Sequence, residues 1–338
     1  GEFKLKNVLI TGHNGYIGPH MIEVLRNKGG FNIFGCDINL FSDAAWRELP
    51  QPDVEWIKDF RDLTEQDLAQ IDTVIHLAAI SNDPMGELNP EITLNINAKG
   101  SVEFANRCKK AGVKKFLMSS SCSIYGKSAK MDMVETDNTD PLTTYAKSKI
   151  HVEEHLYNLG SGDFCVSFLR NSTAYGDSPN LRTDLVVNNF LACAVARNEL
   201  RIMSDGTPWR PLIHCRDIAN AFVLFIDAPH DLINQQVVNI GANDQNFQVS
   251  DVAEIAQEIF PDCSVNFTGE AVNDSRDYKV NFDKFTKMFP DFSFEYNLKT
   301  GMKELAARLV DFNFSAQDFD GEQFVRLKVI AKKLDLIA

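Results

Sequence analysis

Tyr145 and Lys149 are the two residues of this 338-residue sequence whose types and spacing point most directly to chemistry. Residues four apart share a helix face, so the Lys149 ammonium would lie beside the Tyr145 phenol. A neighbouring cation stabilises the phenolate and lowers the pKa of a tyrosine from about 10 towards that of a useful general base. A hydroxyl from the serines at 119–121, which follow an apolar run, could share the proton. The pattern Y-x-x-x-K alone also fits a half-buried aromatic ring beside a surface lysine.

Three glycines, Gly12, Gly15 and Gly18, lie where an apolar run at 8–10 gives way to an amphipathic stretch at 16–28. Glycines permit a tight turn and let backbone N–H groups approach a pyrophosphate at a helix N-terminus. The sequence therefore predicts a dinucleotide-binding turn, for which an ordinary glycine-rich turn is the alternative.

Asp37 ends the next apolar run. A carboxylate at this point can accept hydrogen bonds from the ribose hydroxyls of an adenosine. Ile38 and Asn39 follow, with no arginine to neutralise a ribose 2′-phosphate, so the residues predict NAD rather than NADP as the cofactor.

Alternating apolar runs and amphipathic stretches must position these residues. Strands that alternate with helices predict a parallel sheet covered on both faces, which is a Rossmann-like, doubly wound α/β fold. The predicted strands are 8–10, 31–36, 54–57, 73–79, 116–118 and 165–169, and the predicted helices are 16–28, 63–71, 91–111, 142–159, 184–197, 217–227, 250–260 and 299–311.

The regular alternation ends after Tyr175, where prolines become frequent. We expect an NAD-binding domain of residues 1–174 together with about 212–242. The segments 175–211 and 243–338 are expected to form a smaller C-terminal lobe that binds the substrate.

The composition limits the partners. There are 34 Lys and Arg against 47 Asp and Glu, a net charge of −13. This charge disfavours nucleic acid and anionic membranes, although a few arginines and one helix N-terminus can still bind a small phosphate ligand. The seven cysteines include no C-x-x-C pair, which predicts reduced thiols in a cytoplasmic protein. No apolar run reaches the roughly 18 residues that span a bilayer.

The segment His151–His155 fits the zinc signature H-x-x-E-H. It continues the Tyr145 helix, and the remaining histidines offer no convincing third ligand. We therefore expect a solvated or interface helix face and no metal site.

Further motifs occur in order along the chain. Besides the glycine run, Asp37 and the Tyr145–Lys149 pair, they are Asp59-Phe60, His76-Leu77-Ala78-Ala79, Asn97, Ser121, Leu169–Gly176, the R-x-x-x-H-x-x-D run Arg210–Asp217, and Arg276-Asp277. Over nearly the whole chain this set resembles the extended short-chain dehydrogenase/reductases, specifically the NAD-dependent nucleotide-sugar epimerase/dehydratase group.

The resemblance implies roles for many residues. It implies that Ser121, Tyr145 and Lys149 are catalytic. The NAD site would comprise Gly12, Asn14, Gly15, Tyr16, Ile17, Gly18, Asp37, Asp59, Phe60, Leu77, Ala78, Ala79, Asn97, Tyr145 and Lys149. The substrate, a nucleoside-diphosphate sugar, would contact Ser81, Ser123, Asn171, Thr173, Arg182, Arg210 and Arg276.

Three of those substrate residues are arginines, which can pair a diphosphate bidentately. Arg182, Arg210 and Arg276 are therefore the candidates for the substrate's phosphates. An ion pair on the surface or between the domains is the alternative for each of them.

The family's mechanism is transient oxidation of the sugar. Tyr145 would take a proton from a sugar hydroxyl, usually at carbon 4, while a hydride passes to NAD. Ser121 would hold that oxygen, and Lys149 would bind the nicotinamide ribose. Return of the hydride to the other face gives an epimer, loss of water gives a 4-keto-6-deoxy sugar, and release of the ketone makes the enzyme a dehydrogenase.

Two positions favour epimerisation. The family's dehydratases carry an Asp-Glu pair after the active-site threonine, where this chain has Cys122 and Ser123. The decarboxylating members use a nearby glutamate that this segment lacks. We expect packing rather than catalysis from Cys122, and a 4-epimerase from the chain.

Several alternatives stay open. They are a nucleotide-sugar 4-dehydrogenase or 4-ketosugar reductase, a 4,6-dehydratase, and a non-catalytic NAD-binding protein. Thr173 stands where many members carry Asn, and 178–188 resembles a branch that includes a GDP-heptose 4-dehydrogenase, so the base and the sugar stay open too. The family also often dimerises through two long helices, here near 91–110 and 142–159, which predicts a homodimer.

Overall fold

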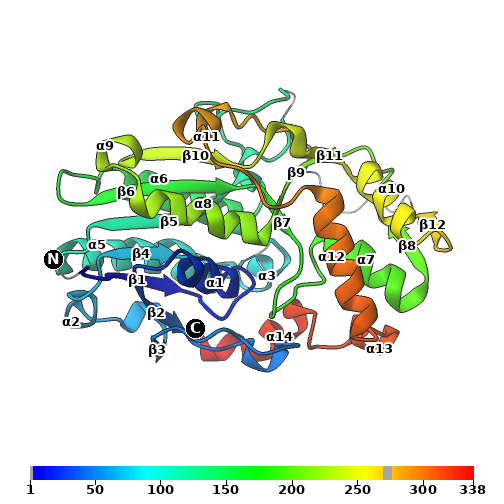
Figure 1. Ribbon diagram of the computed structural model, residues 1–338, viewed down its shortest axis with the longest axis horizontal. Helices are drawn as coiled ribbons and strands as arrows, with labels where there is room; N and C mark the ends of the chain where they lie inside the picture. The colour runs from blue at the N-terminus through cyan, green and yellow to red at the C-terminus, as the bar shows by residue number, and fades with distance from the viewer. Residues whose placement is uncertain (1–2, 82, 129, 269–275) are drawn as a thin grey trace.

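The centre of the molecule is a parallel sheet that joins distant parts of the chain (Figure 1). The computed structural model describes residues 3–81, 83–128, 130–268 and 276–338. Seven strands pair in the order β10-β6-β5-β4-β1-β2-β3, and every pairing is parallel. The strands are β1 (Lys6–Thr11), β2 (Phe31–Asp37), β3 (Val54–Ile57), β4 (Thr73–His76), β5 (Lys115–Ser121), β6 (Cys165–Asn171) and β10 (Gln236–Ile240). The predicted Rossmann-like, doubly wound fold is confirmed.

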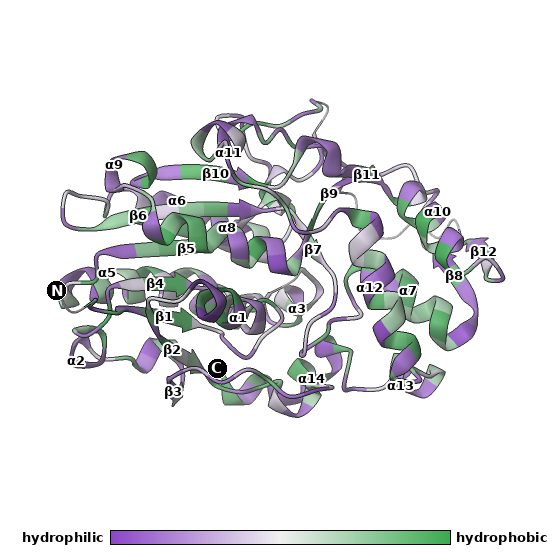
Figure 2. Cartoon of the chain, in the orientation of Figure 1, coloured by the Kyte–Doolittle hydropathy of each residue, from purple (hydrophilic) through white to green (hydrophobic). Residues whose placement is uncertain are grey.

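Helices cover both faces of this sheet, because most of its strands are apolar on both sides (Figure 2). One face carries α1 (Gly18–Lys28), α8 (Cys215–Asp227), α9 (His230–Ile233) and α11 (Asp283–Met288). The other side carries α2 (Glu65–Leu68), α3 (Asp83–Leu88), α4 (Pro90–Leu94), α5 (Ser101–Ala111), α6 (Thr144–Tyr157) and α14 (Arg326–Lys333). The strand order reverses between β1 and β4, which is where doubly wound sheets bind their ligands.

A second packed unit lies beyond the carboxyl ends of the strands (Figure 1). Its helices are α7 (Val186–Arg197), α10 (Val249–Ile259), α12 (Leu298–Asp311) and α13 (Ala316–Asp320). Its short strands are β7 (Thr173–Tyr175), β9 (Trp209–His214) and β11 (Asn246–Gln248) in one sheet, and β8 (Glu199–Ile202) and β12 (Ser264–Phe267) in another.

Two predicted helices differ from the structure. The stretch 63–71 contains only the four residues of α2, which a Thr64–Asp67 capping box starts. The stretch 91–111 is divided into α4, a π-helical segment η3 (Asn95–Gly100) and α5. Shorter 3-10 turns are η1 (Ser42–Ala44), η2 (Phe60–Asp62), η4 (Cys122–Tyr125), η5 (Asn243–Gln245) and η6 (Leu334–Leu336).

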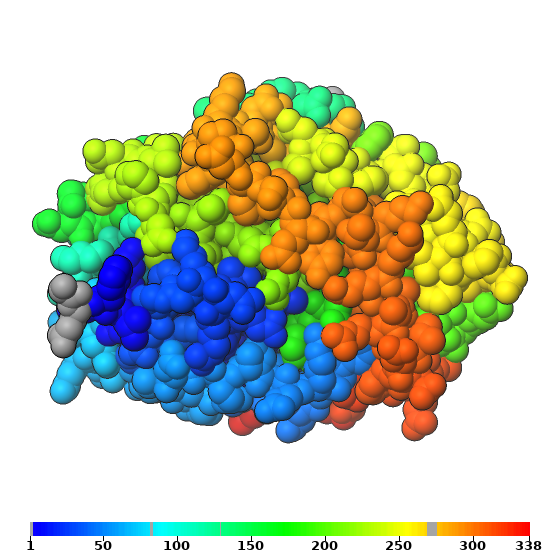
Figure 3. Space-filling view, in the orientation of Figure 1, coloured from blue at the N-terminus to red at the C-terminus, as the bar shows by residue number. Residues whose placement is uncertain are grey.

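The C-terminal residues return to the sheet. Ile330 and Ile337 are buried in the core beneath α5 and α6. Lys333 Nζ donates to the Leu40 carbonyl at 2.7 Å, just after β2. In the space-filling view the red C-terminal residues border the blue N-terminal ones (Figure 3). Residues 326–338 thus lie against the half expected to bind NAD, and the division into two functional domains stays a prediction.

Over the ranges that the structure describes, no helix is long and apolar enough to cross a bilayer.

Candidate active site

The glycine-rich turn links β1 to α1 at the point where the strand order reverses. Gly12 has a φ of 73°, and a Cβ there would come within 3.0 Å of the Ala78 backbone. A Cβ on Gly18 would collide with the His13 carbonyl oxygen. A side chain at Gly12 would therefore push the turn away from the segment that follows β4, and one at Gly18 would distort the turn itself. The absence of both side chains keeps the first N–H groups of α1 open to an anion.

Asp37 holds this turn to the end of β2. Its Oδ2 accepts a hydrogen bond from the Asn14 N–H at 3.1 Å, and its Oδ1 accepts one from the Asn39 N–H at 2.8 Å. The Asn14 side chain donates to Asn39 Oδ1 at 2.8 Å. Each carboxylate oxygen has a second lone pair, so Asp37 can still accept from ribose hydroxyls.

Asp59 and Phe60, which the resemblance assigns to the NAD site, are only partly open. Asp59 caps η2 and forms an ion pair with Arg61 at 2.7 Å, so its carboxylate already has a cationic partner. Phe60 is buried, with its ring centroid 4.7 Å from that of His76.

Hydrogen bonds fix the segment that follows β4. Thr11 Oγ1 accepts from the N–H groups of Leu77 and Ala78 at 3.1 and 3.2 Å. Asn97, buried in the π-helical segment η3, accepts from the Ile80 N–H at 2.8 Å and donates to the Ile80 carbonyl at 2.9 Å. Residues 77–80 are thereby held beside the glycine-rich turn.

The predicted tyrosine and lysine do share a face of α6. Lys149 Nζ lies 5.4 Å from the centroid of the Tyr145 ring and donates to the Ser119 carbonyl at 2.9 Å. Burial lowers the pKa of Lys149 to about 8, and the nearby Glu153 carboxylate partly offsets this effect. The ammonium can therefore bind a ligand hydroxyl and stabilise negative charge on the phenol.

Ser121 ends β5 and faces Ser123. Its Oγ accepts from the Ser123 N–H at 3.1 Å and donates to Ser123 Oγ at 2.9 Å. β5 thus carries both Ser121 and the carbonyl that anchors Lys149, which ties the two groups to one strand.

A buried polar network supports Lys149, and no motif in the sequence indicated it. Glu153 Oε1 accepts from Arg170 Nη2 at 2.6 Å, and Glu153 Oε2 accepts from Ser120 at 2.5 Å. Arg170 Nη1 also donates to the Tyr125 phenol at 3.0 Å. The spacing of Lys149 and Glu153 could have revealed part of this network, because Glu153 is one turn beyond Lys149 on the same helix face.

Arg182 and Asn171 are two of the predicted substrate residues, and Arg182 already has a partner. Its side chain, which is 6% exposed, pairs with Asp184, with an Nη2–Oδ2 distance of 2.6 Å, and donates to Ser81 Oγ at 3.1 Å. Asn171 donates to Ser119 Oγ at 3.0 Å, and its buried Oδ1 has no hydrogen-bond partner in the described part of the chain. The structure thus joins Arg182 to Ser81, and Asn171 to the strand of Ser121.

A second group of predicted substrate residues lies around Tyr278. Arg210 Nη1 donates to the Trp209 carbonyl at 2.8 Å and to the Arg276 carbonyl. Its guanidinium carbon is 5.9 Å from the Tyr278 ring centroid. Thr173 hydrogen bonds to the Tyr278 side chain.

Tyr16 points away from the turn that carries it. Its phenol donates to the Gly176 carbonyl at 2.5 Å and accepts from the Asn188 side chain at 3.1 Å. The ring therefore joins the turn to the second unit, and only the backbone of Tyr16 stays available for a cofactor.

Cys122 and the histidines of the zinc-like motif make contacts within the protein. Cys122 is fully buried and its Sγ donates to the Arg170 carbonyl, 3.2 Å away, and burial raises the pKa of the thiol. His151 and His155 stack on each other with ring centroids 3.8 Å apart. Within 3–81, 83–128, 130–268 and 276–338, no three His, Cys, Asp or Glu residues are placed to hold a metal.

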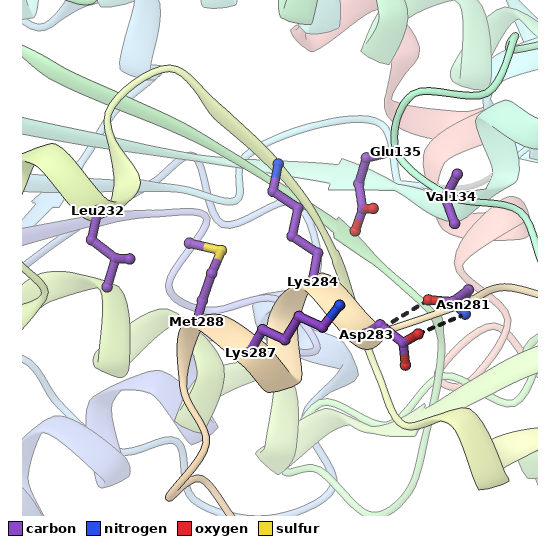
Figure 4. A pocket seen from close by; sticks show the side chains of 8 residues that line it. All are labelled: Val134, Glu135, Leu232, Asn281, Asp283, Lys284, Lys287 and Met288. Carbon is purple, nitrogen blue, oxygen red and sulfur yellow. Dashed lines mark hydrogen bonds between the residues drawn. The ribbon is translucent and has the colours of Figure 1, made fainter.

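A hollow of about 540 Å³ lies beside β10, the strand at one edge of the central sheet (Figure 4). Two of the residues that line this hollow form hydrogen bonds with backbone groups of β10. Lys284 donates to the Val237 carbonyl at 2.7 Å, and Glu135 accepts from the Asn239 N–H at 2.9 Å. None of the residues lining it belongs to the predicted site, and these two protect a strand edge.

A family model described as the NAD dependent epimerase/dehydratase family matches residues 8–241. The chain belongs to this family. Its cofactor is therefore NAD, and the residues fit that dinucleotide. The glycine-rich turn has no room for side chains at Gly12 and Gly18, and the buried Oδ1 of Asn14 has no partner among the described residues.

Members of the family with different activities are similar to this chain. UDP-glucose 4-epimerase of Neisseria meningitidis serogroup C is 28% identical over 286 residues, which cover 74% of this chain and 80% of the relative. UDP-glucuronic acid decarboxylase 4 of Arabidopsis thaliana is 24% identical over 319 residues, covering 90% and 70%.

Solved structures share the fold. MoeE5 in complex with UDP-glucuronic acid and NAD is 27% identical, with a TM-score of 0.76, and the match covers 89% of this chain and 99% of that one. The NAD-dependent NDP-hexosamine 5,6-dehydratase TunA is 24% identical, with a TM-score of 0.81, and the match covers 90% and 98%. The family is thus established, while its members differ in the reaction that they catalyse.

Proposed function

We propose that this enzyme is a 4-epimerase of nucleoside-diphosphate sugars that oxidises carbon 4 transiently. The observation that carries the proposal is the ending of β5. There Ser121 is followed by Cys122, a buried thiol that donates to a backbone carbonyl, and by Ser123. Neither residue is suited to remove water from a 4-keto sugar, so return of the hydride is the favoured outcome.

In the proposed mechanism Tyr145 takes the proton of the 4-hydroxyl. Lys149 favours the phenolate because its ammonium lies near the ring, and it also binds the nicotinamide ribose. Ser121 holds the sugar oxygen through its hydroxyl. NAD bound at the glycine-rich turn and Lys149 would supply the reversible hydride acceptor that oxidation and reduction of carbon 4 require.

The diphosphate of the substrate is assigned to Arg210 and Arg276. Arg182, paired with Asp184 and joined to Ser81, is proposed to line the sugar end of the site. Ser123, Asn171 and Thr173 are proposed to contact the sugar nucleotide from β5, β6 and β7.

Incubation of the purified protein with UDP-, GDP-, CDP- and dTDP-sugars tests the activity. An epimer that forms without net NADH supports the proposal. Stoichiometric NADH, or a ketone released into solution, would instead identify a 4-dehydrogenase, the alternative that the 178–188 run favours.

Tyr145→Phe tests the assignment of the base. The variant should lose turnover by at least about 1,000-fold, because it removes the phenol that is assigned to take the 4-hydroxyl proton, yet it should bind NAD as the wild type does. A nearly normal rate would show that another residue is the base.

We also propose a cytoplasmic homodimer that pairs through 91–110 and 142–159. Leu94 in α4 and Tyr157 in α6 are 41% and 44% exposed, which suits an apolar contact between subunits. Light scattering coupled to gel filtration should give twice the monomer mass, and Tyr157→Glu should reduce it.

A further inference from the structure

Arg326, the first residue of α14, is a buried cation that the proposed mechanism does not use. It is 4% exposed, and its guanidinium carbon lies 4.5 Å from the Phe41 ring centroid. Its Nη2 donates to the Asn180 carbonyl at 3.3 Å, whereas its Nε has no hydrogen-bond partner among the residues that the structure describes. Buried guanidinium N–H groups normally find acceptors, so this arrangement points to an acceptor supplied by a ligand.

Asn180 connects Arg326 to the glycine-rich turn. Its side chain donates to the Asn14 carbonyl at 2.8 Å and to the Phe41 carbonyl at 3.2 Å. The Oδ1 atoms of Asn14 and Asn180 are also buried without partners in the described ranges. Unpartnered polar atoms therefore gather beside the turn.

The two carboxylates near Arg326 are already engaged by other groups. Burial and, to a smaller extent, the nearby Arg182 lower the pKa of Arg326 to about 9, although Asp184 and Asp37 act in the opposite direction. Asp184 is already paired with Arg182, and Asp37 accepts from two backbone N–H groups. Two neighbouring buried cations therefore favour an added anion, since an uncompensated buried charge is strongly unfavourable.

We propose that Arg326 binds the pyrophosphate of the NAD cofactor, so that the C-terminal helix α14 completes the dinucleotide site. The planar guanidinium can donate two parallel hydrogen bonds to phosphate oxygens. Asp37 ends β2, Phe41 follows it by four residues, and Asn180 joins Arg326 to Asn14 in the turn. The turn and the end of β2 hold the dinucleotide in this fold. This inference rests on NAD binding and is independent of the fate of the sugar.

The test is isothermal titration of NAD⁺ into the nucleotide-free full-length protein and its Arg326→Gln variant. Loss of a charged hydrogen-bond donor should raise the Kd for NAD⁺ by about 10- to 100-fold. Lys333→Gln is the matched control, because it removes a cation and one anchor from the same helix. Its Kd should stay within about threefold of the wild-type value.

Titration with UDP distinguishes the cofactor's diphosphate from that of the substrate. The inference requires that Arg326→Gln weakens NAD⁺ and leaves UDP unchanged. Weakened UDP with unchanged NAD⁺ would assign Arg326 to the substrate, and two unchanged affinities would make the residue structural; either result overturns the proposal.

Wild-type hydrogen exchange provides a second test in case Arg326→Gln does not fold. Saturation with NAD⁺ should slow exchange in 326–333, relative to the distant helix α10. Equal exchange in 326–333 with and without NAD⁺ would also overturn the proposal.

Discussion

Two buried groups of charges in this protein each contain one carboxylate and two cations, but their surroundings differ. In the inner group, Glu153 pairs with Arg170 and faces Lys149; in the outer group, Asp184 pairs with Arg182 and faces Arg326. Each carboxylate thus has one fully engaged arginine and a second cation whose pKa burial lowers. Because the arginine engages the carboxylate in each group, the second cation, Lys149 or Arg326, does not pair with that carboxylate. The second cation is therefore available to a ligand.

The two groups differ in how completely they are enclosed. The side chains of Glu153 and Arg170 are 7% and 6% exposed, and Ser120 and Tyr125 complete their hydrogen bonds. The side chain of Asp184 is 20% exposed. The inner group should therefore matter more for folding, and the outer group more for binding.

Glu153→Gln should have the largest effect, because it leaves both Arg170 and Lys149 buried without their anion. We expect a loss of about 3–5 kcal/mol in the free energy of unfolding, measured with urea. Glu154→Gln, its exposed neighbour on α6, should change it by no more than about 0.5 kcal/mol. Equal effects of the two variants would contradict the importance of the inner group.

Asp184→Asn makes the same change in the outer group. Solvent reaches this carboxylate, so the loss of unfolding free energy should be smaller, at about 1–2 kcal/mol. The same urea titration measures it. A loss as large as that of Glu153→Gln would remove the distinction between the groups.

Lys149→Met should stabilise the NAD-free protein by about 1 kcal/mol at pH 7 while abolishing turnover, since it removes a desolvated ammonium. Folding lowers the pKa of Lys149 from 10.5 to about 8, so between these pH values the unfolded chain binds more protons. The lysine's contribution to wild-type stability therefore rises with pH in this window, and the variant's advantage should shrink from pH 8 to 10.5. If the stability advantage of Lys149→Met did not change with pH, desolvation of the Lys149 ammonium could not be its cause.

The smallest effect concerns repulsion between Arg182 and Arg326. Each single Gln variant relieves that repulsion, whereas the double variant relieves it only once. The double variant should therefore be more destabilised than the sum of the singles, by about 0.5–1 kcal/mol in urea unfolding. Additive effects would show that the two cations do not interact.

The parts that the sequence predicted well are those with local patterns. Alternating strands and helices indicated the sheet, and the 142–159 and 299–311 helices are confirmed as α6 and α12. The spacing of Tyr145 and Lys149 placed both side chains on one helix face, as the structure shows.

Long-range pairings were not predictable in this way. Arg326 reaches Asn180 across 146 positions, and Arg61 reaches the Ile337 carbonyl across 276. The residues of α14 have the pattern of an ordinary amphipathic surface helix, and nothing in their spacing indicates the loop that they cover. The ion pair of Arg182 with Asp184 was one of two alternatives for Arg182, and the sequence did not decide between it and a phosphate ligand.

The return of α14 to the first half of the molecule has a consequence for protein synthesis. A ribosome makes the glycine-rich turn and β2 long before it reaches Arg326, so a nascent chain could bind the dinucleotide only without that guanidinium. A chain cut short before residue 326 would lack Arg326 and also Ile330 and Ile337, which are buried in the core beneath α5 and α6. If Arg326 binds the pyrophosphate as proposed, such a chain would lose its nucleotide easily. Tight retention of NAD would then report that translation had passed this point.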